Sequence, residues 1–109
     1  MNKLLIAMLA AAGLGMAVPA LAADIAAGKE KAAMCVACHG EGGNKPLMAE
    51  YPKIAGQPAD YLAKALRDYK SGKRKNPVMA PMAQTLSKQD IKDVSAYFAS
   101  QPGDLVVKY

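Results

Sequence analysis

The chain has 109 residues, a formal net charge of +5 at pH 7, two cysteines, one histidine and no tryptophan. This length suits one small domain, and three Cys and His side chains cannot supply the four ligands of a structural zinc site. The mild positive charge favours an acidic protein partner, whereas the scarcity of aromatic residues and the lack of a recognisable motif argue against nucleic acid.

The first 22 residues resemble a cleaved secretory signal peptide. Lys3 precedes an apolar run, Leu4 to Val18, and Ala20-Leu21-Ala22 has the small-x-small form of a cleavage site. Cleavage would leave a domain of residues 23–109 and, with Lys3 lost, lower the formal charge from +5 to +4. The alternative is an uncleaved membrane anchor, because the apolar stretch approaches the roughly 20 residues that span a bilayer.

The first helix of the mature chain is predicted from Ile25 to His39, with Asp24 as its N-cap and Gly40 after its end. Gly28 lies inside this helix, where glycine costs about 1 kcal/mol relative to alanine. We therefore interpret Gly28 as a point where another helix approaches closely.

Residues 35–39 have the C-x-x-C-H pattern of covalent c-type haem attachment. Cys35 and Cys38 lie about one helical turn apart, so both thiols can form thioethers to one edge of a porphyrin. His39 follows directly and can bind the iron as the proximal ligand. The motif predicts one covalently bound haem c, which would also supply much of the core of so small a domain.

Two other interpretations of the cysteine pair fit less well. A dithiol redox site is expected in a βαβ context, and this chain shows little strand pattern. A disulfide alone would leave His39 without a role.

Residues 40–59 are predicted to form a loop, because glycines and prolines interrupt any regular structure. A loop of this length in a small domain is expected to cover another part of the structure, and we expect it to cover the edge of the haem. The Pro46 carbonyl is a candidate acceptor for the His39 Nδ1 hydrogen. The residues that either pack on the ring or fill a small core are Leu47, Tyr51, Pro52 and Ile54.

The second helix is predicted from Ala59 or Asp60 to Ser71, before Gly72. Its apolar face consists of Tyr61, Leu62, Ala65, Leu66 and Tyr69. The basic residues 73–75 that follow are either a docking patch or a solvated charge run.

Residues 76–82, Asn-Pro-Val-Met-Ala-Pro-Met, are predicted to form an extended, proline-bounded strap. Since His39 is the only histidine, a methionine is the expected sixth ligand of the iron. Met79 and Met82 are both candidates, and the other is expected to fill space in the core.

The last helix is predicted to begin after Ser87, with Asp90 completing a capping box, and to end before Pro102-Gly103. Its apolar residues recur at helical spacing and are Ile91, Val94, Tyr97 and Phe98.

Taken together, the C-x-x-C-H-G motif, residues 51–57, the methionine strap, Leu86-Ser87 and Ala96-Tyr97-Phe98 resemble the class I c-type cytochromes. The chain is similar to the small single-haem proteins that match one half of the two-haem, two-domain members. The resemblance implies an all-α cytochrome c fold, with three main helices and irregular loops around one haem. It also implies Met79 as the distal ligand, with Met82 as runner-up. Gly28 is implied to let the first helix cross the last helix at Tyr97 or Phe98.

The sequence therefore predicts a soluble, monomeric, periplasmic one-electron carrier with His/Met ligation, and not an enzyme. Its expected partners are respiratory redox proteins with an acidic docking face, and membrane contact is expected only through membrane-bound redox complexes. The alternatives are a haem enzyme or gas-binding protein with a labile sixth ligand, or a membrane-tethered subunit of an oxidase or dehydrogenase.

Overall fold

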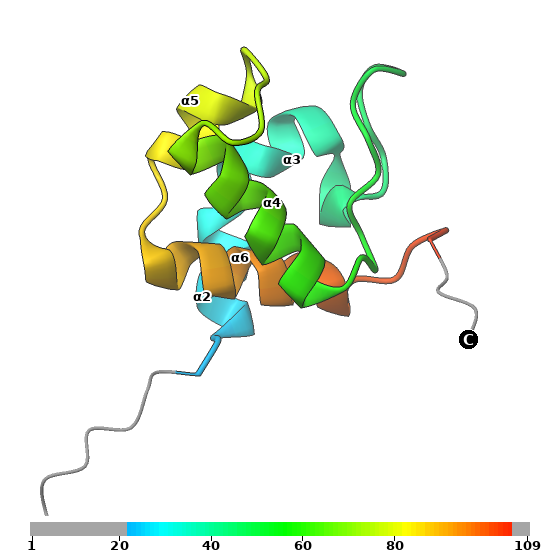
Figure 1. Cartoon of the computed structure of the whole chain (residues 1–109). Helices are drawn as coiled ribbons and strands as arrows, with labels where there is room; N and C mark the ends of the chain where they lie inside the picture. Colours follow the sequence, from blue (N-terminus) through cyan, green and yellow to red (C-terminus); the bar gives the residue numbers. More distant parts are fainter. Residues whose placement is uncertain (1–21, 106–109) are drawn as a thin grey trace, which may run out of the picture.

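The structure is a computed structural model that describes residues 22–105, and these residues form helices joined by loops without any strand (Figure 1). The predicted leader lies outside the described residues except for Ala22, as do residues 106–109. Within the described range, no helix has the length and apolar character needed to cross a membrane.

The predicted first helix is two helices, α2 (Ile25–Lys31) and α3 (Ala33–His39). Its start is as expected, because the Asp24 carboxylate accepts a hydrogen bond from the Ala27 N–H at 3.1 Å. The prediction of one continuous helix was wrong. At Ala32 the chain makes a tighter turn, in which the Cys35 N–H donates to the Ala32 carbonyl three residues back at 2.8 Å.

Two further helices have the predicted positions. α4 (Ala59–Ser71) ends at Gly72, which has a φ of 85° that glycine adopts without steric cost. α6 (Lys88–Ser100) begins at Ser87 with the predicted capping box. In that box the Ser87 hydroxyl accepts from the Asp90 N–H at 3.0 Å, and the Asp90 carboxylate accepts from the Ser87 N–H at 2.9 Å.

Residues 76–82 are not an extended strap, because α5 (Met79–Gln84) begins within them. The Asn76 side-chain oxygen accepts from the N–H groups of Val78 and Met79, both at 2.9 Å, and starts the turn. Pro81 falls in the first turn of α5, where a backbone N–H has no partner within the helix, so proline does not prevent helix formation there. The 40–58 segment is a loop as predicted, apart from the short 3-10 helix η1 (Glu41–Gly43).

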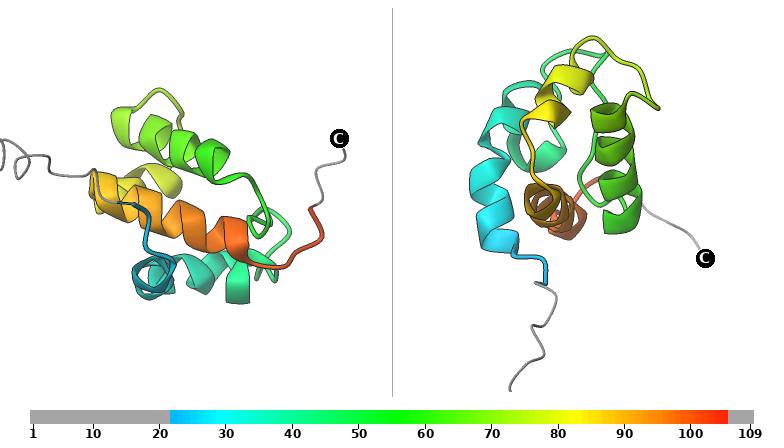
Figure 2. Two further views of the ribbon diagram at one scale, coloured as in Figure 1. Left: turned by 90° about the horizontal axis from the view of Figure 1, so that it is seen from below. Right: turned by 60° about the vertical axis from the view of Figure 1, so that its left-hand side comes forward.

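α6 lies between α2 on one side and α4 on the other (Figure 2). The close approach of α2 to α6 depends on Gly28, since a Cβ atom built there would lie 2.0 Å from the carbonyl oxygen of Asp93 in α6. This confirms that Gly28 is a point of close approach and places it against Asp93 and Tyr97. The core between the helices is formed by Ala32, Leu62, Val94, Tyr97 and Phe98, with a second cluster of Ala63, Leu86 and Ile91.

The capping box of α6 leads to a prediction about pH. Its hydrogen bond from the Ser87 N–H is the main reason that the pKa of the Asp90 carboxyl is below its usual value. A carboxyl whose pKa is lowered by folding stabilises the protein above its unfolded pKa of about 3.9, and this stabilisation is lost as the pH falls through the folded value. Asp90→Asn should therefore destabilise the protein by up to about 1 kcal/mol at pH 7, and by much less near pH 2.5.

Urea unfolding at the two pH values measures this difference. Ser87→Ala is the comparison variant, because it removes the uncharged hydroxyl acceptor of the box and should cost about 1 kcal/mol at pH 7. Since the Ser87 side chain also contributes to the lowered Asp90 pKa, a part of this cost should be lost near pH 2.5. An equal loss in Asp90→Asn at pH 7 and pH 2.5 would contradict the assigned role of the charge.

Candidate functional site

The two cysteines of the motif lie on one face of α3 and are half-buried free thiols. Burial, with a smaller contribution from Cys38, raises the pKa of the Cys35 thiol to about 11. Dithiol redox sites instead lower the pKa of their attacking cysteine. The surroundings of Cys35 therefore argue against that interpretation and leave a thiol that is protonated at neutral pH.

His39 is the last residue of α3 and is buried, with 7% of its surface exposed. Its Nδ1 lies 2.7 Å from the Pro52 carbonyl oxygen. Because a carbonyl only accepts hydrogen bonds, Nδ1 must carry the hydrogen and Nε2 keeps its lone pair for a metal. The imidazole is thus held in the tautomer that a proximal ligand needs.

The expectation that Pro46 would orient His39 was wrong, and the path of the loop explains why. Residue 45 packs against Gly40, where a Cβ atom would lie 1.8 Å from the Lys45 carbonyl oxygen. Further on, the Ile54 N–H donates to the Gly43 carbonyl at 2.8 Å, which turns the chain back under α3. These two contacts bring Pro52 to the imidazole.

A cavity of about 440 Å³ opens beside α3, and the loop, α4, α5 and α6 complete its wall. The two cysteines and the histidine of the C-x-x-C-H motif line it, together with both candidate methionines. The whole apolar face predicted for α4 lines it as well, which assigns that face to the cavity. The lining residues from the motif, the two methionines and the apolar face of α4 are Cys35, Cys38, His39, Met79, Met82, Tyr61, Leu62, Ala65, Leu66 and Tyr69.

Three of the four loop residues expected at the cofactor line this cavity, namely Tyr51, Pro52 and Ile54. Leu47 does not: it is 70% exposed and lies with Met48 on a separate surface hollow formed by residues 46–53. Met48 therefore does not line the cavity that contains His39.

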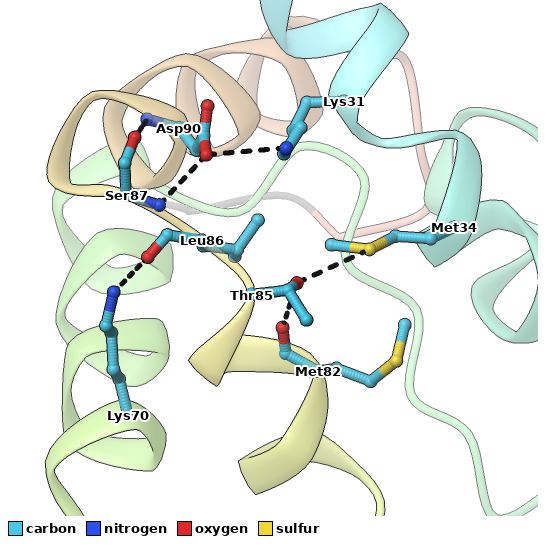
Figure 3. A network of polar contacts seen from close by, with 8 residues as sticks. All are labelled: Lys31, Met34, Lys70, Met82, Thr85, Leu86, Ser87 and Asp90. Atoms are coloured by element: carbon cyan, nitrogen blue, oxygen red, sulfur yellow. Dashed lines mark hydrogen bonds and ion pairs between the residues drawn. The ribbon is translucent and has the colours of Figure 1, made fainter.

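Met79 and Met82 lie three residues apart at the start of α5, so they occupy neighbouring positions on its surface. The Asn76 turn holds the Met79 end of α5. At the Met82 end, Thr85 bonds both to the Met82 carbonyl and to Met34 of α3. In Figure 3 the Thr85 hydroxyl lies between the Met82 carbonyl oxygen, at 2.7 Å, and the Met34 sulfur, at 3.8 Å.

The junction of α5 with α6 is also tied to α4 (Figure 3). The Lys70 ammonium donates to the Leu86 carbonyl. The Gln84 side-chain amide, which the figure does not draw, donates to the Lys70 carbonyl at 2.6 Å. These contacts could not be predicted from the sequence, because a lysine that binds a distant carbonyl looks the same there as a solvated lysine. The consequence is a rigid attachment of α5 across the cavity from α3.

The side chains around the cavity fit a covalently bound haem. One helix offers two thiols and an imidazole with a free Nε2, and another offers thioether sulfurs to the same space. The wall between them is largely apolar, as a porphyrin face requires, and it includes Val94 and Phe98. Lys53 and Arg74 also line the cavity and suit the carboxylates of a haem.

Comparisons with known proteins agree with this fit. A family model for cytochrome c matches residues 25–102. Cytochrome c4 of Pseudomonas aeruginosa is 50% identical over 102 residues, which cover 93% of this chain and 49% of that protein. Cytochrome c-554(548) of Halomonas halodenitrificans is 47% identical over 83 residues, which cover 73% of this chain and 99% of that protein.

The fold agrees as well. A crystal structure of reduced recombinant cytochrome c4 from Pseudomonas stutzeri superimposes with a TM-score of 0.71 at 43% identity, covering 77% of this chain and 48% of that one. The chain thus spans about half the length of its cytochrome c4 relatives, and the predicted likeness to one half of the two-domain members is confirmed. The chain belongs to the cytochrome c family, and its cofactor is a covalently bound haem c.

Proposed function

We propose that the chain is a periplasmic one-electron carrier in which Cys35 and Cys38 hold the haem through thioethers. His39 is the proximal ligand of the iron and Met79 the distal ligand. The observation that supports this proposal best is the shared cavity, which His39 lines from α3 and Met79 from α5. The family's carrier members, cytochrome c4 among the relatives, support the same function.

The chain's own residues have three tasks in this proposal. The bound haem supplies a reversible one-electron couple, and a histidine with a methionine ligand favours its reduced state. The Pro52 carbonyl keeps His39 oriented in both oxidation states. The apolar face of α4 and the side chain of Phe98 exclude water from the cavity, which limits the rearrangement that accompanies each transfer.

Filling both axial positions leaves the iron no open site, so no substrate chemistry is proposed. The partners are other redox proteins, and the basic residues near the cavity would meet an acidic surface on them. These are Lys73 and Lys75, which are exposed beside Arg74, a residue of the cavity wall. Association through such a surface weakens as salt screens it.

An optical spectrum and a carbon monoxide experiment test the proposal on the purified holoprotein. The ferric protein should show the weak absorbance near the red edge that marks methionine sulfur bound to iron. The ferrous protein should bind carbon monoxide slowly or not at all at neutral pH. Rapid binding together with a missing red-edge absorbance would favour the gas-binding or enzymatic alternative with a labile sixth ligand.

The location is proposed separately, from the leader pattern of residues 1–22. Mass measurement of the protein recovered from the periplasm should give a chain that begins at Ala23. A membrane-bound chain that retains residues 4–22 would support the tethered alternative instead.

A further inference from the structure

Asp93 is a buried carboxylate on the face of α6 that α2 covers. It is 6% exposed, and its neighbour across the interface is Gly28. Its Oδ1 atom accepts two hydrogen bonds, from the Asp24 N–H at 2.8 Å and from the Gln89 side-chain amide at 2.9 Å. Both donors are neutral groups.

No cation compensates this carboxylate within residues 22–105. The ion pairs formed there join Lys31 to Asp90, Lys53 to Asp104 and Lys64 to Asp68. A buried carboxylate without a positive partner is costly, because neutral donors replace only part of the solvation that the charge has lost. Among the described residues, Asp93 therefore has no cationic partner, and a positive group placed beside it would offset this cost.

The predicted cleavage point of the leader lies directly beside Asp93. The Asp24 N–H is already bonded to its Oδ1, and the nitrogen of Ala23 is one residue earlier, within about 4 Å of the Asp24 nitrogen by chain geometry. The Gln89 amide that bonds Asp93 also lies 3.2 Å from the Ala22 carbonyl oxygen. The peptide bond between Ala22 and Ala23 thus lies against α6.

We propose that Asp93 is the binding site for the α-ammonium group of the processed chain at Ala23. A signal peptidase adds water across the Ala22–Ala23 bond, which releases the leader as a carboxylate and leaves a primary amine on Ala23. That amine is protonated at neutral pH and forms an ion pair with Asp93. Processing thereby completes the interface between α2 and α6. This inference rests on the leader part of the proposed function and not on the ligands of the iron.

A double-mutant cycle on holoproteins with a designed N-terminus tests this site. One protein begins at Ala23, and a second carries Gly-Ser before Ala23, which moves the ammonium two residues away. Both are exported with a foreign leader, and mass measurement verifies their first residue. The extension should raise the unfolding equilibrium constant about tenfold, as measured by urea unfolding, because it removes a partly buried ion pair.

The same extension should have no effect when Asp93 is replaced in Asp93→Asn. Asp90→Asn is the matched control, because Asp90 lies on the same helix but pairs with Lys31, and the extension should keep its tenfold effect there. An extension that destabilises the Asp93→Asn protein as much as the unmodified protein would overturn the proposal.

A second measurement covers the case in which Asp93→Asn does not fold. The Ala23 α-amine of the unmodified, folded protein should react with an acylating reagent about tenfold more slowly than the extended amine, since an ion pair keeps it protonated. Equal rates would overturn the proposal. The optical spectrum of each protein reports the haem ligands independently, so failure of this site and failure of the carrier function are distinguishable.

Discussion

Replacing Met79 with alanine is expected to abolish the red-edge absorbance of the ferric protein and to open the iron to carbon monoxide. The thioether is the proposed distal ligand, and Met79, at the start of α5, lines the same cavity as His39. Loss of the thioether should lower the reduction potential by on the order of 0.2 V, a fraction of the roughly 0.8 V range that axial ligands span. Spectroscopy and a redox titration of the purified holoprotein measure both effects.

Two methionine variants serve as controls. Met82→Ala should keep the absorbance and most of the potential, because Met82 is expected to fill space beside the haem. Met48→Ala should change neither, because Met48 is 53% exposed on the other hollow. If Met82→Ala loses the absorbance while Met79→Ala keeps it, the two residues exchange roles, and Thr85 becomes the group that holds the ligand's backbone.

Gly28→Ala should strongly destabilise the protein. In an ordinary helix the change from glycine to alanine is favourable by up to about 1 kcal/mol. Here the added Cβ would lie 2.0 Å from the Asp93 carbonyl oxygen and 2.5 Å from its carbon, and backbone atoms cannot move aside as a side chain can. The two helices must separate, so we expect a loss of about 3 kcal/mol or more in the free energy of unfolding.

Gly72→Ala distinguishes this steric effect from a general intolerance of alanine at glycine positions. Nothing lies within 4 Å of a Cβ atom at Gly72, but its φ is 85°, so only the left-handed backbone conformation opposes the change. It should cost about 1 kcal/mol. Urea unfolding of both holoproteins measures the difference, and a Gly28→Ala protein as stable as the unmodified one would show that α2 and α6 do not approach so closely.

The parts of the fold that depend on neighbouring residues could be predicted from the sequence. The bounds of α4 follow from its amphipathic pattern and the terminal Gly72, and the start of α6 follows from the Ser87 and Asp90 pair. The C-x-x-C-H motif likewise carries its meaning within five residues, so the haem was predictable. All of these are local signals, in which the interacting groups lie within one or two helical turns.

The errors arose where a distant contact or an unusual turn decides the structure. The break at Ala32 and the choice of Pro52 as the partner of His39 depend on how the chain packs on itself. The strap was predicted to be extended because two prolines bound it, whereas the Asn76 side chain starts a helix that tolerates Pro81 in its first turn. The choice between the two methionines stays a prediction.

The central place of α6 has a consequence for biogenesis. α6 is the last helix of residues 22–105, yet both α2 and α4 pack on it, so the core forms only after nearly the whole chain has emerged. In the finished core Cys35 packs against the buried cluster that contains Phe98. During synthesis, residues 35–39 therefore emerge before α6, and their side chains remain accessible until the core that contains Phe98 forms against Cys35.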